Sequence, residues 1–313
     1  MKRRIFMLLL TPLAMSSVGC NKNQEKTPDL GPVDVILISG QSNAVGCTRS
    51  SYIKTSISLE KYNQYEAGFD NIKISHDCWT KDGPSSSGTY SYYSQNASNG
   101  FVPVKLGQGN GPETFGPEIG IADYYHETRG DKLFIIKYAC GASNLKDDFA
   151  QRNSEMYPRL IAYVKKAMSQ LKKKGYRPTL KAFCWMQGEG DAWGPEYYNY
   201  YKANLRTFVG NVRQDLLSLS GNVEMAFIDA KINGYGQWSA YGYGWSYVNI
   251  AKGEFSEESE NNFLIDTIAE GMTSLNEPTG APDKDHYDSA SEVKLGKLFA
   301  QYFEPFLMPL DEE

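Results

Sequence analysis

Three residues in this sequence have the types and positions that nucleophilic catalysis requires. Ser42 lies in "GQSN", directly after an apolar run at 33–39. A serine hydroxyl needs a neighbouring base before it can attack an ester. His286, in "DKDHYD", is a candidate base, and Asp283 precedes it by three residues. A carboxylate at this spacing can reach the second imidazole nitrogen and fix its tautomer, which is the role of the third member of a catalytic triad.

The chain contains only two other histidines. His126 is expected in the middle of a helix, on a solvated face. His76 is expected just after a strand and could lie near the same sheet edge as Ser42. Asp285, adjacent to His286, is an alternative carboxylate partner. The spacing alone leaves both aspartates open as partners of His286.

Strands and helices that alternate along the chain must position these residues. Continuous apolar runs are typical of strands buried in a parallel sheet, and periodic apolar residues with end signals are typical of helices. Strands are predicted at 33–39, 71–75, 132–139, 179–187 and 223–230, with a short sixth at 263–267. Helices are predicted at 115–130, 156–175, 196–219 and 289–303, and Trp245 is expected to open another. This order predicts an α/β fold with a doubly wound, mostly parallel sheet of five or six strands and helices on both faces.

Polar clusters follow three of the predicted strands. "GQSN" ends the first, "CGASN" the third and "QGEGD" the fourth. Ligands bind outside the carboxyl ends of the strands in such sheets. The sequence therefore predicts one site at this edge. The Ser-, Tyr- and Asn-rich stretch at 82–100 is predicted to be a long surface loop.

The beginning of the chain predicts export. A basic start and a short apolar core lead through small residues to Cys20. "SVGC" is similar to the lipobox of bacterial lipoproteins, so Cys20 is predicted to carry a lipid; plain cleavage near Gly19 is the alternative. The predicted parts are a signal peptide (1–19), a tether (20–32) and a single domain (33–310). The protein is expected in the periplasm or as an outer-membrane lipoprotein, with the membrane reached only through this lipid.

Charge and cysteine content exclude several kinds of partner. Without residues 1–19 the chain has 29 Lys and Arg against 37 Asp and Glu, a net charge of −8. This acidity disfavours nucleic acid as a partner. No His/Cys pair has metal-ligand spacing, so neither a metal nor a cofactor is predicted. The disulfide state of four cysteines and the oligomeric state stay open; the cysteines are Cys47, Cys78, Cys140 and Cys184.

The blocks "GQSNAVG", "FGPEIGIA", "KYACGASNL", "WMQGEGDA" and "DKDHYD", in this order, resemble the SGNH hydrolase superfamily. Within it, the chain is similar to carbohydrate esterases of family six and to the sialate O-acetylesterase-like domain. The resemblance implies a flavodoxin-like three-layer sandwich. It also implies a triad of Ser42, Asp283 and His286, with an oxyanion hole from Ser42, Gly141 and the Gln187 side chain.

Several neighbours of these residues are expected to support the site. Ala142 stands where the family has a second glycine, which affects the local loop shape more than the reaction. Glu189 and Asp191 could act as a glycosidase-like acid and base, but a supporting role is preferred because both lie in one short loop. The residues predicted to support the site are Gln41, Asn43, Glu189 and Asp191.

The expected function is a serine esterase that removes O-acetyl groups from carbohydrate through an acyl-enzyme on Ser42. Acetylated plant polysaccharide such as xylan is the preferred substrate, with Trp238 and Tyr241 as candidate sugar-stacking residues. The alternatives are a sialate 9-O-acetylesterase and a catalytically idle sugar-binding module. A sialate carboxylate would need an arginine, and Arg49 and Arg152 are the candidates nearest the motifs.

Overall fold

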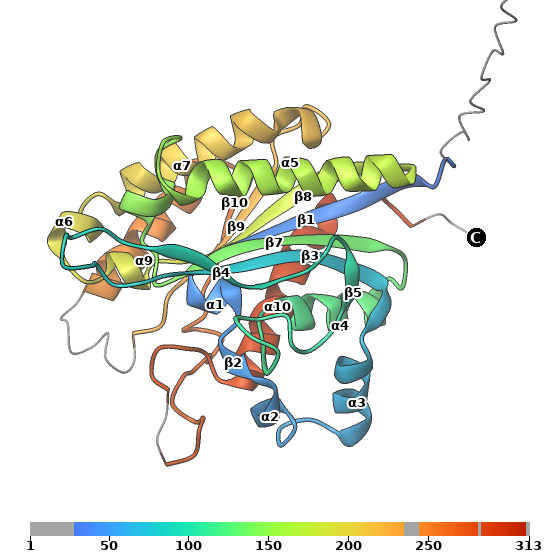
Figure 1. Ribbon diagram of the computed structural model, residues 1–313, viewed down its shortest axis with the longest axis horizontal. Helices are drawn as coiled ribbons and strands as arrows, with labels where there is room; N and C mark the ends of the chain where they lie inside the picture. The colour runs from blue at the N-terminus through green and yellow to red at the C-terminus, as the bar shows by residue number, and fades with distance from the viewer. Residues whose placement is uncertain (1–27, 235–243, 281–282, 311–313) are drawn as a thin grey trace, which may run out of the picture.

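A twisted central sheet carries helices on both faces (Figure 1). The computed structural model describes residues 28–234, 244–280 and 283–310. The predicted signal peptide, Cys20, Trp238 and Tyr241 lie outside the described residues. Within them, no helix is both long enough and apolar enough to span a bilayer.

The main sheet has eight strands, and six of them run parallel. The strand order is β10-β9-β8-β1-β7-β3-β4, and β5 also pairs with β3. The parallel strands are β1 (Gly31–Gly40), β3 (Phe69–Lys81), β7 (Leu133–Gly141), β8 (Tyr176–Met186), β9 (Ala226–Ala230) and β10 (Asn262–Ile265). The antiparallel strands are β4 (Tyr92–Ala97) and β5 (Val102–Val104), and a separate pair joins β2 (Thr48–Arg49) to β6 (Thr114–Phe115). The predicted mostly parallel, doubly wound sheet is therefore confirmed. The predicted number of five or six strands is corrected to eight within the described residues, because β4 and β5 extend the sheet beyond its six parallel strands.

β1 is the strand at which the winding changes direction. It pairs with β7 on one side and with β8 on the other, and the later strands β9 and β10 continue beyond β8. In open α/β sheets such a switch point leaves a crevice outside the carboxyl end of the strand. The residues that follow Gly40 therefore lie at the crevice.

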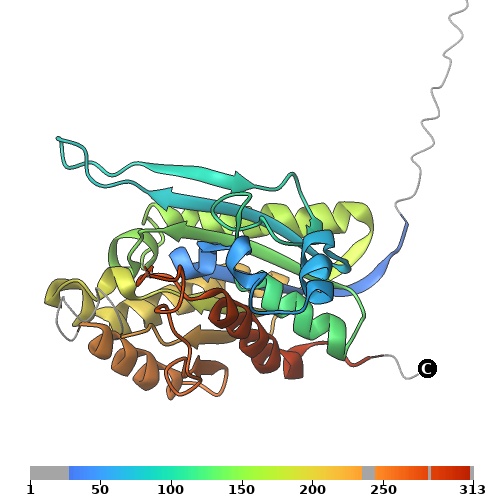
Figure 2. The same ribbon diagram turned by 90° about the horizontal axis from the view of Figure 1, so that it is seen from below.

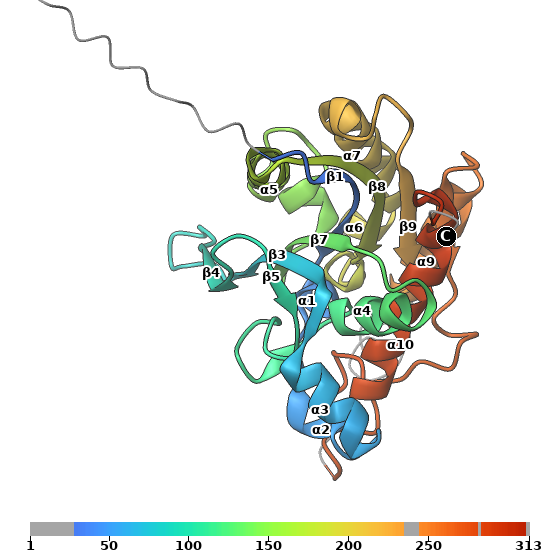
Figure 3. The ribbon, with the colours of Figure 1, turned by 90° about the vertical axis from the view of Figure 1, so that its right-hand side faces the viewer.

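Two layers of helices enclose the sheet (Figures 2 and 3). α5 (Met156–Lys174) and α7 (Tyr201–Leu216) cover one face, and α4 (Glu118–Thr128) and α10 (Ser289–Phe303) cover the other. α9 (Gly244–Ser256) begins one residue before Trp245, as predicted. The shorter helices are α1 (Ser42–Val45), α2 (Ser50–Ile53), α3 (Leu59–Ala67) and α6 (Pro195–Tyr198).

The core lies between the sheet and these helices. β7 is buried along its whole length, which agrees with a central strand covered on both faces. On the α5 and α7 side, aromatic rings meet edge to face, with Phe149 and Trp185 at 5.2 Å between centroids. Such pairs add to the stabilisation from burial.

The structure corrects three further predictions. The stretch 82–100 is not a loop throughout, because β3 continues to Lys81 and forms a hairpin with β4. His76 lies inside β3 and is buried, rather than after the strand. The helix predicted at 196–219 is divided into α6 and α7. The first two predictions were wrong because β3 and β4 continue through polar residues. Such residues lack the apolar pattern from which a strand is predicted.

Candidate active site

Ser42 begins α1 directly after β1, at the carboxyl edge of the sheet. The turn requires glycine at position 40, where φ is +142° and an added Cβ would lie 2.0 Å from the Met186 carbonyl oxygen. The same applies to Gly46, where φ is +91° and a Cβ would lie 2.3 Å from the Gly116 nitrogen. The "GQSNAVG" block is therefore a tight strand-to-helix turn that leaves Ser42 half-buried.

Gln41 joins this turn to the loop after β8. Its Oε1 accepts hydrogen bonds from the backbone N–H of Gly188 at 3.2 Å and of Gly190 at 3.1 Å. It also accepts from Gln187 Nε2 at 3.2 Å. Three donors on one buried oxygen fix the "QGEGD" loop against the first turn.

Asp283 and His286 form a hydrogen-bonded pair. The distance from Asp283 Oδ2 to His286 Nδ1 is 2.8 Å. The other carboxylate oxygen, Oδ1, accepts the backbone N–H groups of Asp285 at 3.0 Å and of His286 at 3.3 Å. These backbone bonds hold the carboxylate in place, so the imidazole is oriented through Nδ1. The structure thus pairs His286 with Asp283, the preferred carboxylate.

Asn43 brings the Ser42 turn and the His286 loop together. Its Oδ1 accepts the Tyr287 N–H at 3.1 Å, and its Nδ2 donates to the Asp285 carbonyl at 3.4 Å. The residues on both sides of His286 are therefore bonded to the residue next to Ser42. In the described part of the chain no hydrogen bond joins the Ser42 hydroxyl to the imidazole. Catalytic hydrogen bonds often tighten only when substrate is bound.

His286 lies beside Cys47 at the surface of the site. Burial works against the charged imidazolium, but hydrogen bonds with Asp283 and with Cys47 outweigh it and raise the pKa of His286 to about 11. The pKa of Asp283 is lowered, because its hydrogen bond to His286 overcomes the opposing effect of burial. The pair therefore favours the ionised state of both partners.

Two adjoining depressions open at this pair, with volumes of about 230 and 440 Å³. Cys47, Arg49, Asp283 and His286 line both of them. The first continues along Tyr52 and the second along the loop at 110–114. A small acyl ester can thus reach the imidazole from solvent.

The two carboxylates of the "QGEGD" loop hold neighbouring parts of the site. Asp191 is fully buried and accepts the Leu145 N–H at 2.7 Å and the Lys146 N–H at 3.3 Å. Glu189 Oε1 accepts from Asn43 Nδ2 at 2.8 Å. Burial raises the pKa of Asp191 to about 6 and also raises that of Glu189. Each carboxylate therefore binds a different segment.

Gln187, the expected side-chain donor of the oxyanion hole, is fully buried. Its Nε2 donates to Asp191 Oδ2 at 2.6 Å and to Gln41 Oε1 at 3.2 Å. Its Oε1 accepts from the Tyr201 hydroxyl at 3.0 Å. Both amide hydrogens are directed at protein acceptors, and the bond to Gln41 is the longer one.

Gly141 ends β7, one residue before Ala142, at the same edge as Ser42. Ala142 adopts φ +58°, the left-handed region in which glycine carries no penalty. Ala142 therefore adopts a backbone conformation that glycine would adopt more readily. Its cost is local strain at one exposed residue.

The remaining candidates are two arginines, two histidines and four cysteines. Arg49 lies at the rim of the depressions with His286, whereas Arg152 is paired with Asp215 at 3.0 Å on the surface. His76 is buried, and His126 is exposed on α4. The four described cysteines form no disulfide. Within the described residues, no group of His, Cys, Asp or Glu is arranged to hold a metal ion.

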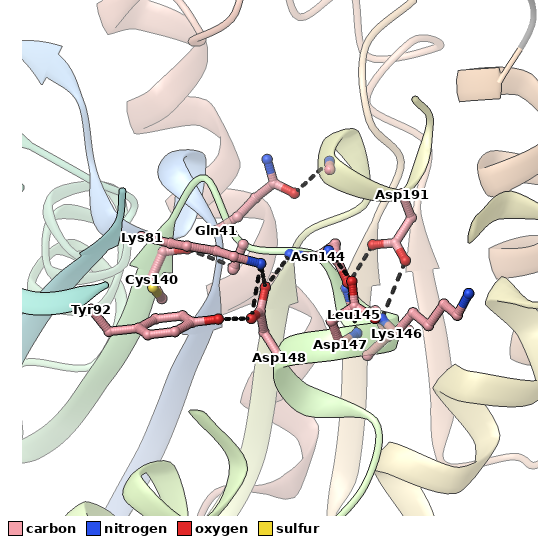
Figure 4. Close-up of polar contacts among 12 residues, drawn as sticks. Gln41, Lys81, Tyr92, Cys140, Asn144, Leu145, Lys146, Asp147, Asp148 and Asp191 are labelled. Atoms are coloured by element: carbon pink, nitrogen blue, oxygen red, sulfur yellow. Dashed lines mark hydrogen bonds and ion pairs between the residues drawn. The ribbon is translucent and has the colours of Figure 1, made fainter. Parts of the chain in front are cut away.

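The sequence did not identify the buried ion pair between Lys81 and Asp148 (Figure 4). Lys81 Nζ lies 2.9 Å from Asp148 Oδ2. Asp148 also accepts the Tyr92 hydroxyl at 2.5 Å and the Asn144 N–H at 2.8 Å. This network fixes the β3–β4 hairpin to the loop that follows β7. The sequence signal for this ion pair is the two adjacent aspartates in "NLKDD", one residue after the "KYACGASNL" block.

Comparison with solved structures supports the fold. NanS aligns with 90% of this chain and 98% of its own, at 14% identity and a TM-score of 0.61. A protein of Arabidopsis thaliana aligns over 88% and 100%, at 18% identity and a TM-score of 0.58. A carbohydrate acetylesterase from Xanthomonas citri aligns over 88% of this chain and 56% of its own, at 13% identity and a TM-score of 0.53.

Comparison with family models identifies the chain more directly. The model described as "Carbohydrate esterase, sialic acid-specific acetylesterase" matches residues 32–304. A search of curated protein sequences returns no significant match. The family match covers most of the chain, and the chain therefore belongs to this family of carbohydrate esterases.

Proposed function

We propose that this carbohydrate esterase hydrolyses O-acetyl esters of sugars through an acetyl-enzyme on Ser42. The observation that carries the proposal is the pair formed by Asp283 and His286 at 2.8 Å, tied to the residue beside Ser42. Nothing in a sugar-binding module requires an oriented imidazole next to a strand-end serine. The idle binding module is therefore the weaker alternative.

In the proposed reaction, the neutral imidazole of His286 takes the proton of the Ser42 hydroxyl as the oxygen attacks the acetyl carbonyl. Asp283 holds the imidazole through Nδ1 and stabilises its charge. The protonated His286 then gives its proton to the departing sugar oxygen. Water, deprotonated by the same histidine, attacks the acetyl group, and acetate leaves as Ser42 regains its proton.

We propose that the oxyanion is held by the N–H groups of Ser42 and Gly141, with Gln187 as the third donor. Each such donor contributes about 3–4 kcal/mol to lowering the barrier. Gln187 would redirect the hydrogen now shared with Gln41, because that bond, at 3.2 Å, is the longer of its two. The shorter bond to Asp191 keeps the amide in position.

Neutral acetylated polysaccharide such as xylan is the proposed substrate. The protein is acidic overall, which disfavours an anionic ligand. One of the two candidate arginines, Arg152, is already engaged by Asp215 and Gln214 and lines neither depression at His286. A neutral sugar needs neither.

A second candidate substrate, a 9-O-acetylated sialate, is favoured by one observation. Arg49 lines the same depressions as His286, and among the described residues it forms no ion pair. A guanidinium there can bind a carboxylate in a bidentate manner. Arg49→Ala should then lower activity on the sialate strongly and activity on xylan little.

We further propose that the protein is exported and lipidated on Cys20. The basic start, apolar core and small residues before this cysteine support the proposal. Mass spectrometry of the native N-terminus should find a diacylglyceryl group on Cys20. An unmodified terminus downstream of it would leave secretion alone.

Ser42→Ala tests the catalytic proposal. The variant should fold normally and lose nearly all activity on p-nitrophenyl acetate, apart from the residual effect of binding and the oxyanion hole. Acetate release from acetylated xylan and from 9-O-acetylated sialic acid should be measured beside it. Activity within tenfold of the parent would reject the triad. Turnover of the sialate with none on xylan would reverse the order of the two substrates.

A further inference from the structure

Exposed aromatic side chains are confined to two parts of the described chain. The rings of Tyr90 and Tyr93, both more than 40% exposed, lie on the β3–β4 hairpin. The others lie on the segment that includes α6 and on the first turn of α9. They are Trp193 (47% exposed), Tyr200 (59%) and Tyr247 (51%). Clustered exposed aromatics on a soluble protein mark a binding surface.

The two parts extend toward the same end of the molecule (Figures 1 and 2), the end at which the parallel strands finish. The Tyr198 and Tyr247 rings are stacked at 4.8 Å with 9° between their planes. Trp193 follows Ala192, whose carbonyl carbon lies 2.8 Å from where a Cβ on Gly244 would be. The rings of the α6 segment and of α9 are therefore neighbours.

In each of the two parts a lysine lies over an aromatic ring. Lys81 Nζ lies 4.2 Å from the centre of the Tyr90 ring, and Lys146 Nζ lies 5.1 Å from that of Tyr197. Burial raises the pKa of Tyr197, and Asp147 and Tyr90 raise it further. We call Tyr90, Trp193, Tyr197, Tyr198 and Tyr247 the aromatic rim.

Polar contacts connect two rings of the aromatic rim to the segment that follows β7. Lys81, whose Nζ lies over the Tyr90 ring, is paired with the fully buried Asp148 in this segment (Figure 4). Lys146 Nζ donates to the Glu196 carbonyl at 2.9 Å, next to Tyr197. The loop that carries Gly141 therefore holds both halves of the rim. Rings held in place before binding lose little conformational freedom when a ligand stacks on them.

We propose that the aromatic rim binds a neutral polysaccharide chain and holds sugar units beyond the one whose acetyl group is at Ser42. This rests on the proposed function. The apolar faces of sugar rings stack on flat side chains, whose polar ends face water. The cations at the rim lie over rings, and the acidic Asp147 and Glu196 stand beside them. A neutral chain fits this balance better than an anionic one.

The first test compares polymer with small ester. Trp193→Ala, Tyr247→Ala and the double variant should be assayed on acetylated xylan and on p-nitrophenyl acetate. The ratio of kcat/KM on polymer to that on the small ester should fall about three- to tenfold for each single variant, mainly through KM. The double variant should fall further. Tyr247→Phe, which keeps the ring stacked on Tyr198, should retain the ratio.

Tyr93→Ala is the matched control. Tyr93 is as exposed as Tyr90 and lies on the same hairpin, but its hydroxyl bonds Asp82 and it alternates with Tyr92 along β4. Since Tyr92 points toward Asp148, Tyr93 faces the other side of the strand. The control should keep the parent ratio. The proposal would be overturned if Trp193→Ala and the double variant had the same polymer-to-small-ester ratio of kcat/KM as Tyr93→Ala.

The second test measures binding without catalysis. In a Ser42→Ala background, electrophoresis through gels containing soluble acetylated xylan or acetylated glucomannan should retard the protein. Retardation should be lost with Trp193→Ala and Tyr247→Ala and kept with Tyr93→Ala. A parent that neither polymer retards would reject the rim as a glycan site while leaving the esterase intact. Conversely, retardation that needs the rim would stand even if Ser42→Ala remained active and the triad failed.

Discussion

Asn43 Oδ1 accepts a hydrogen bond from the Tyr287 N–H at 3.1 Å, across 244 residues of sequence. Asn43 follows Ser42, and Tyr287 follows His286, so this bond ties the proposed nucleophile turn to the loop of the proposed base. Glu189 in turn holds the Asn43 amide at 2.8 Å. We infer that Asn43 is a positioning residue, which sets where the imidazole stands relative to the hydroxyl.

Asn43→Ala should therefore lower kcat about tenfold or more, with KM changed little, since one net hydrogen bond is about 1 kcal/mol and a misplaced base costs more. Stability should fall by about 1–3 kcal/mol because Glu189 loses its buried partner. The matched control is Asn262→Ala, which removes a buried amide that donates to the Phe255 carbonyl at 2.9 Å, at the start of β10. Its stability should fall similarly with kcat intact. An equal loss of kcat in both variants would make the Asn43 effect merely structural.

Replacing the histidines and aspartates one at a time tests the assignment of the base. His286→Ala should abolish activity, whereas His126→Ala and His76→Ala should have mild effects on kcat/KM for p-nitrophenyl acetate. Asp283→Asn should be severe, because the Asp283 carboxylate contacts His286 Nδ1 at 2.8 Å. Asp285→Asn should be weaker. If the two aspartates ranked in the reverse order, the wrong carboxylate would have been assigned.

The pH dependence of activity follows from the raised pKa of His286, to about 11. The reaction needs the neutral imidazole, so kcat/KM should increase with pH beyond the ordinary histidine range near 6.5. Asp283→Asn and Cys47→Ala remove partners of the charged form, and each should move the acidic limb to lower pH. Rates are measured from pH 5 to 10 after subtraction of the uncatalysed hydrolysis. An acidic limb at or below pH 6.5 that neither variant moves would contradict this prediction.

The same shift has a consequence for stability. Because the folded pKa of His286 is raised, the ion pair with Asp283 contributes stability that is fully present below the unfolded pKa. That contribution is lost as the pH rises through the folded pKa. The activity and the ion pair thus respond to pH in opposite directions.

Ala142→Gly should stabilise the protein. Ala142 holds φ +58°, a conformation that costs an L-residue about 1–2 kcal/mol. The greater freedom of glycine in the unfolded chain offsets part of the gain, which leaves about 0.5–1 kcal/mol. Denaturant unfolding measures it, with Ala150→Gly in a right-handed conformation as the control that should destabilise. If Ala142→Gly lowered the free energy of unfolding, the left-handed conformation of Ala142 would not be a source of strain.

Much of the fold could be predicted because the buried parallel strands consist of apolar residues. β1 and β7 are found where apolar runs predict them. The β3–β4 hairpin could not be, because β4 is an edge strand with exposed polar residues and so lacks the alternation that marks a half-buried strand. His76 was misplaced for the same reason, since β3 continues through polar residues.

In the site, too, the residues marked by local sequence could be predicted, and the contacts between distant loops could not. The candidate residues follow strand ends, and strand ends can be read from local sequence. The bond from Asn43 to Tyr287 and the place of Cys47 beside His286 depend on loops distant in sequence. The spacing of residues along the chain does not predict such contacts.

The central claim is that Ser42 carries the acyl group, and the most direct test is to trap it. Phenylmethylsulfonyl fluoride should sulfonylate the Ser42 oxygen; fluoride leaves as the S–F bond breaks, and the hydroxyl proton passes to His286. Fragment mass spectrometry resolves Ser42 from Cys47 within one peptide. We expect one adduct, on Ser42, and it should form at the same rate as activity is lost. It should be absent from Ser42→Ala and His286→Ala. An adduct on Cys47 in the inactivated protein, or labelling that persists in Ser42→Ala, would contradict it.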